Sequence, residues 1–104
     1  MNVDFNTIAT DMLAAMKSVL SNNWPKVEFT VKQFLKGKET RLKMLSEYYL
    51  KREITEQEFK SYLEDEKKIL EAEIDALKVV SKALTQQAVN LAIDVILKAV
   101  KIAI

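Results

Sequence analysis

The sequence contains neither cysteine nor histidine, and it has only one glycine and one proline among its 104 residues. Without cysteine, the chain can form no disulfide bond, thiolate metal site or cysteine nucleophile. Without histidine, it lacks the commonest general base and the commonest transition-metal ligand. Sheets and loop-rich folds need many turn residues, whereas helices need them only at their ends. We therefore expect an all-α fold, with a single helical domain over residues 1–104.

The sequence also lacks the motifs on which most enzymes and nucleic-acid-binding proteins depend. It has no glycine-rich phosphate loop, catalytic triad or nucleophile elbow. The acidic residues at 64–66 lack the histidines that helical di-iron sites use. The net charge of +1 is typical of neither a nucleic-acid-binding protein nor an acidic tail. We therefore expect no enzymatic activity, no cofactor, no metal and no nucleic-acid partner.

The hydrophobic content is high, but it is not gathered in one long run. Hydrophobic residues make up 49% of the chain, which argues against intrinsic disorder. No basic segment precedes an apolar run near Met1, so no signal peptide is expected. No stretch of about 18 uncharged apolar residues occurs, which argues against a spanning helix. These features predict a cytoplasmic globular protein.

Two helices are predicted in the first half of the chain. Apolar residues recur at three- and four-residue spacing and predict an amphipathic helix over about residues 4–21. The segment Asn22-Asn23-Trp24-Pro25 ends it, because proline cannot continue a helix but suits the first position of a new one. A second apolar stripe predicts a helix over about residues 25–52. Gly37 lies inside it, and we expect it to be tolerated at a cost of up to about 1 kcal/mol relative to alanine.

The strongest local signal marks the start of the next helix. Thr55 and Glu58 have the spacing of a capping box, and Ile54 and Phe59 occupy the two positions of a hydrophobic staple. Between residues 81 and 87 there is no glycine, proline, asparagine or capping box that would end a helix. The pattern therefore favours one helix over residues 55–104. At 1.5 Å per residue this helix would be about 70 Å long.

These elements predict a long antiparallel helical hairpin with a kinked first arm, built from helices at about 4–21, 25–52 and 55–104. Two such hairpins would pair as a dimeric four-helix bundle. The alternative is a break near residues 81–86. In that case the same segments would form a compact monomeric four-helix bundle.

The apolar stripes also predict how the two arms pair. Pairing positions whose numbers sum to 108 brings Tyr49 to Phe59 and places the charged residues Lys38 and Glu66 about one turn apart inside apolar seams. We hypothesise that Lys38 and Glu66 meet across the hairpin and fix its register. Alternatively, each side chain extends separately to water. Residues 26–52 have a net charge of +5 and residues 53–78 a net charge of −5, so the two segments attract each other.

The C-terminal segment predicts self-association. From residue 87 onwards its polar residues fall within a narrow sector, and apolar residues occupy the rest of the helix circumference. One amphipathic neighbour cannot cover so wide an apolar surface, so we expect a second copy to do so. The predicted oligomer interface is Val89, Ile93, Ile96, Val100 and Ile104. The alternative is that this surface contacts a membrane or a target helix.

Two aromatic residues complete the candidate sites. Tyr48 lies near the predicted turn beside the stripe residue Tyr49, and we expect it to form an exposed patch for a partner together with Tyr62. The function we expect is a non-catalytic helical module for protein interaction or scaffolding, acting as a homodimer or higher homo-oligomer, with another helical protein as a further possible partner. The alternative is a small membrane- or toxin-associated protein, of the immunity or pore-associated type, that uses the apolar C-terminal helix.

Overall fold

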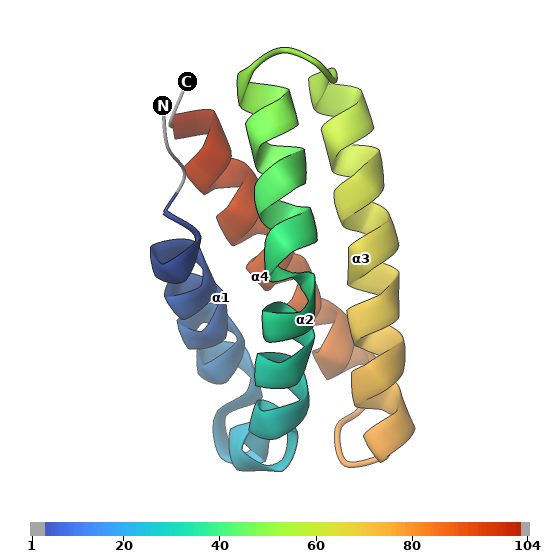
Figure 1. Ribbon diagram of the computed structural model, residues 1–104. Helices are drawn as coiled ribbons and strands as arrows, with labels where there is room; N and C mark the ends of the chain where they lie inside the picture. The colour runs from blue at the N-terminus through green and yellow to red at the C-terminus, as the bar shows by residue number, and fades with distance from the viewer. Residues whose placement is uncertain (1–3, 103–104) are drawn as a thin grey trace.

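The computed structural model describes residues 4–102, and this part of the chain folds as four helices. Successive helices run in opposite directions, and each packs against two others, so that α1 and α3 each contact both α2 and α4 (Figure 1). The arrangement is an up-down-up-down four-helix bundle. The elements are α1 (Phe5–Leu20), the 3-10 turn η1 (Ser21–Asn23), α2 (Trp24–Leu50), α3 (Glu56–Leu77) and α4 (Lys82–Ile102).

The all-α prediction is confirmed, but the extended hairpin is not. The longest dimension of the described chain is 40 Å, far shorter than the 70 Å helix predicted from the sequence. The segment 55–104 is not one helix, because α3 ends at Leu77 and α4 begins at Lys82. The alternative, a compact four-helix bundle, describes the chain, with its break at 78–81 instead of 81–86.

The first half of the chain also differs from the predicted kinked arm. The helix bounds are close to those expected, and Pro25 lies in the first turn of α2 as predicted. However, Ser21 adopts φ 52 and ψ −117, and η1 then reverses the chain. As a result α1 lies antiparallel beside α2 and does not extend it (Figure 1).

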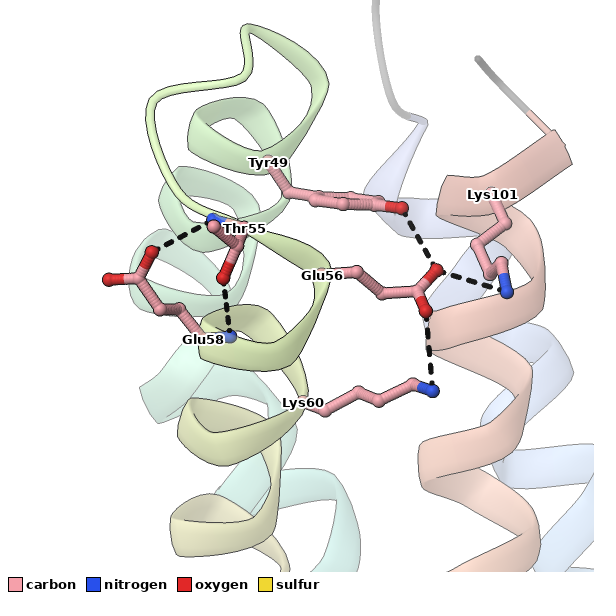
Figure 2. A network of polar contacts seen from close by, with 6 residues as sticks. All are labelled: Tyr49, Thr55, Glu56, Glu58, Lys60 and Lys101. Carbon is pink, nitrogen blue, oxygen red and sulfur yellow. Dashed lines mark hydrogen bonds and ion pairs between the residues drawn. The ribbon is translucent and has the colours of Figure 1, made fainter.

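Each reversal of the chain contains a non-glycine residue with positive φ. These residues are Ser21, Arg52 and Lys78, with φ of 52, 61 and 57. A side chain in this region costs roughly 1 kcal/mol. Helix capping offsets part of that cost. The Thr55–Glu58 capping box is present at the start of α3, as predicted (Figure 2). At the start of α4, the Ser81 hydroxyl accepts a hydrogen bond from the Leu84 N–H at 3.2 Å.

The core runs the length of the bundle and takes side chains from all four helices. Met12 and Met16 of α1, Phe59 of α3 and Ile96 of α4 are almost completely inaccessible to water. Trp24, at the start of α2, is 5% exposed and anchors the first reversal. Burial of apolar surface from all four helices is the main force that holds the compact form together.

Candidate interaction surface

The predicted oligomer interface lies mainly inside the bundle. Val89, Ile96 and Val100 are buried, and Ile93 is partly buried against the core. Ile104 lies outside the described residues. A single neighbour was expected for this segment, whereas α4 packs against both α1 and α3. The chain therefore covers most of this apolar stretch by itself, and burial of these residues requires no second copy.

The exposed apolar side chains gather elsewhere. Of the eight large hydrophobic residues that are exposed in the described chain, seven lie on α2, on α3 or in the turn after α3, and only Leu91 lies on α4. Helices α2 and α3 lie side by side (Figure 1). We call their outward surface the α2–α3 face, and we define it by residues Phe29, Gly37, Met44, Tyr48, Tyr62 and Ile69.

A groove of about 470 Å³ runs between the two helices on this face. Phe29 is 75% exposed at its edge, and Ile69, on the α3 side, is 43% exposed. A β-carbon at Gly37 would meet no atom within 4 Å, so the glycine leaves the groove open and is not needed for close packing. The groove is lined by Phe29, Thr30, Gln33, Phe34, Gly37 and Lys38 of α2 and by Ile69 and Glu73 of α3.

The predicted aromatic patch extends the same face. Tyr48 and Tyr62 are 38% and 37% exposed. Tyr62 lies seven residues, or two helical turns, before Ile69, so the two share one side of α3. Met44 and Tyr48 lie seven and eleven residues after Gly37, so they share one side of α2 with it. The structure therefore places Tyr48 and Tyr62 on the surface that carries the groove. Their role in binding a partner stays a prediction.

A charged cluster joins α2 to α3 beneath this face. The buried Glu66 carboxylate accepts a hydrogen bond from Arg41 Nε at 2.7 Å, and Lys38 Nζ lies 3.1 Å from its other oxygen. Lys38 approaches as an ion-pair partner, outside hydrogen-bond geometry. Lys38 and Glu66 thus meet across the two helices, while their role in setting the register stays a prediction. Arg41 was not expected as a partner of Glu66, although 41 and 66 sum to 107, one less than the pairing rule requires.

A second polar network joins three helices at the end of the bundle near the α2–α3 turn (Figure 2). Glu56 accepts a hydrogen bond from the Tyr49 hydroxyl (3.2 Å) and pairs with Lys101 Nζ (3.0 Å) and Lys60 Nζ (3.4 Å). The Tyr49 ring also stacks on Phe59, with centroids 5.0 Å apart. The network therefore connects the end of α4 to the turn between α2 and α3.

The electrostatics of this network suit structure better than catalysis. The hydrogen-bonded Lys101 ammonium is the main cause that holds the pKa of Glu56 below its ordinary value. Burial, and then the bond to Glu56, raises the pKa of Tyr49 above its ordinary value. Both pKa values are shifted away from neutral pH, whereas a general acid or base works best with a pKa near the pH at which it exchanges its proton. Among residues 4–102 there is also no group of three or more acidic residues placed to hold a metal ion.

The geometry leaves the α2–α3 face as the surface best suited to contact another molecule. It combines an open groove, a protruding phenylalanine and two exposed tyrosines, and tyrosine and phenylalanine are enriched at protein interfaces. Comparison of the chain with protein-family models, with curated proteins and with solved structures finds no match.

Proposed function

We propose that this chain is a non-catalytic helical module for protein interaction or scaffolding that acts as a homo-oligomer, and that the α2–α3 face is its contact surface. The observation that carries this proposal is Phe29, exposed at the edge of a groove whose other side is formed by Ile69. Leaving a phenylalanine in water forgoes about 2 kcal/mol relative to burial. Several large apolar residues grouped on one face are typical of surfaces that bind a protein partner.

The experiment compares the solution mass of three forms of the protein by light scattering across micromolar concentrations. We expect the wild type to have a mass of at least twice 11.9 kDa, and Phe29→Ser/Ile69→Ser to lower it towards that of a single chain. Leu91→Ser is the control, because Leu91 is an exposed large hydrophobic residue on α4, which does not form this face.

A wild-type mass of 11.9 kDa at every concentration would overturn the homo-oligomer. An equal loss of mass in the Leu91→Ser control would show that the α2–α3 face is not the contact surface. Circular dichroism of both variants checks that the bundle remains folded. All three substitutions are at exposed positions, so a large loss of helix content is not expected.

A second candidate function follows from α4. Within the described chain it is the one helix that is long and apolar enough to cross a membrane. A membrane- or toxin-associated protein, of the immunity or pore-associated type, would use this helix. Core residues such as Val89 and Ile96 would then have to leave the bundle, which would expose the apolar surfaces of α1 and α3. Flotation of the intact protein with lipid vesicles, together with protection of α4 from protease, would support this alternative.

A further inference from the structure

We propose that two copies of this chain can also associate by exchanging α4, so that α3 and α4 join into one helix and the α4 of each copy packs in the bundle of the other. This inference goes beyond the proposed function, because the exchange leaves the α2–α3 face uncovered. The feature that permits it is the turn at residues 78–81, which joins α3 to α4.

The turn at residues 78–81 reverses the chain without any residue that favours a reversal. It contains no glycine, proline or asparagine, and Lys78 adopts φ 57, which is sterically unfavourable for a side chain. The other two reversals are followed by strong helix-start signals, Pro25 and the Thr55 capping box. A short, strained connection of this kind favours exchange of the element that it carries.

The arrangement of α3 and α4 makes the exchange geometrically simple. The two helices lie side by side, run in opposite directions and meet at the turn at one end of the bundle (Figure 1). A two-fold axis at this end, perpendicular to the plane of the two helices, places each α3 in line with the α4 position of the other copy. Each α3 can therefore continue straight into that position, in the direction in which α4 runs there. The joined helix over residues 56–102 is about 70 Å long.

The joined helix keeps core residues of α3 and α4 on one side. Leu70 of α3 lies 18 residues, or five helical turns, before Ala88 of α4. Ile74 lies the same distance before Ala92. All four side chains are fully buried in the compact bundle. The two-fold axis requires this common side, because it places the cores of both bundles on the same side of each joined helix.

The end of the bundle at this turn exposes a residue from the core side of α3. Leu77 is three residues after the core residue Ile74, but it is 38% exposed because α3 ends there. In the exchanged dimer a second bundle continues from this point and covers Leu77. Lys78 is the only charged residue in the two turns at this end, residues 21–23 and 78–81 (Figure 1), so bringing two such ends together removes few charges from water.

The exchange preserves the contacts that stabilise α4. In the exchanged dimer α4 packs against the α1 and α3 of the other copy through the residues that it uses in its own chain. The two forms therefore differ in the turn, in the junction and in the freedom lost on association. Because α4 must leave the core to exchange, we expect the exchanged dimer to form when chains fold together at high concentration.

The ion pair between Glu56 and Lys101 distinguishes the two forms. It joins the start of α3 to the end of α4 at 3.0 Å (Figure 2). The pair therefore lies within one chain in the compact bundle and between two chains in the exchanged dimer. A carbodiimide converts such a pair into an amide bond, so the link records which chains were in contact.

The experiment mixes unlabelled chains with chains labelled with heavy nitrogen, unfolds them in urea and refolds them together at high concentration. Carbodiimide is then added, and mass spectrometry identifies the linked peptides. We expect Glu56–Lys101 links that join a labelled to an unlabelled chain. The link between Glu56 and Lys60, which are 3.4 Å apart within α3, is the matched control and should never be mixed.

Lys78→Gly tests the turn. Glycine fits φ 57 and disfavours a continuous helix, so this variant should lower the yield of mixed links about tenfold. Lys68→Gly, inside α3, is the control. It weakens the same helix in both forms, so it should leave the yield unchanged.

The outcomes separate this inference from the proposed function. Mixed Glu56–Lys101 links, together with unmixed Glu56–Lys60 links, support the exchange. If every Glu56–Lys101 link is unmixed after refolding, the exchange is overturned, whereas the α2–α3 face is still decided by the mass of the native protein. A yield of mixed links that Lys78→Gly leaves unchanged overturns the assignment of residues 78–81 as the hinge.

Discussion

Replacing Thr85 with valine should stabilise the bundle. Thr85 lies in the first turn of α4 and is completely buried, and its Oγ1 has no hydrogen-bond partner among the residues that the structure describes. A buried hydroxyl without a partner costs about 1–3 kcal/mol. Valine has the same branched shape with a methyl group in place of the hydroxyl, so it removes this cost without opening a cavity. From the lower end of that range we expect a gain of about 1 kcal/mol, which corresponds to a rise in melting temperature of about 5 °C for a domain of this size.

The assay is urea unfolding followed by circular dichroism, at a single protein concentration because self-association would add to the apparent stability. Ser46→Ala is the matched control. Ser46 is also buried, but its hydroxyl donates a hydrogen bond of 2.8 Å to the Leu42 carbonyl, so its removal should bring no gain. A lower midpoint for Thr85→Val, with an unchanged slope, would show that the Thr85 hydroxyl is satisfied in solution and would refute the reasoning.

Three further predictions concern the turns and the charged clusters. Lys78→Gly should stabilise the chain by about 1 kcal/mol, because residue 78 has φ 57, where glycine avoids the steric cost of a side chain. The same change at Lys68, inside α3, should destabilise the chain by about 1 kcal/mol, and thermal unfolding of both variants tests the pair. Because the pKa of Glu56 is lowered in the folded state, its contribution to folding stability should be present above its ordinary pKa and be lost as the pH falls through the lowered value. Glu56→Gln should therefore reduce the fall in melting temperature at acidic pH, in melting curves recorded between about pH 2 and pH 7. Replacing Lys38 and Arg41 with methionine should lower the free energy of unfolding in urea by about 3 kcal/mol, because it leaves Glu66 charged and unpaired in the core. Adding Glu66→Leu should recover most of this loss. A triple variant with unchanged helix pairing and oligomeric state would refute a role of the cluster in setting the register.

Much of the fold is predictable because its signals are local. Pro25 marks the start of α2, and Thr55 with Glu58 marks the start of α3, since both act through the backbone of a single turn. The Tyr49–Phe59 stack also follows from the spacing of the apolar stripes. These features depend on neighbouring residues or on helical periodicity, and both can be observed in a single sequence.

The break between α3 and α4 could not be predicted in the same way, because it uses none of the usual breakers. Lys78 adopts the left-handed conformation without being glycine, and Ser81 caps α4 without a glutamate at the third helical position. A lysine at this position is unfavourable locally and is tolerated only because folding back buries α4 against α1. That gain depends on contacts between segments that are far apart in the sequence. Ser81 was the one local signal that could have located the break, because serine is favoured at helix N-caps and here accepts a hydrogen bond from the Leu84 N–H.

The location of the candidate surface depends on the same folding event. As long as residues 55–104 are taken as one helix, the apolar C-terminal segment has a single neighbour, and self-association must bury it. Once α4 folds back between α1 and α3, that segment becomes core, and most of the large apolar residues left exposed lie on α2 and α3. Phe29 is such a residue: it lies on the side of α2 opposite to the core residue Val27 and eight positions before the only glycine. A large apolar residue that does not contribute to the core of its own chain is a stronger indication of a partner than the most apolar segment, because a compact fold buries that segment first.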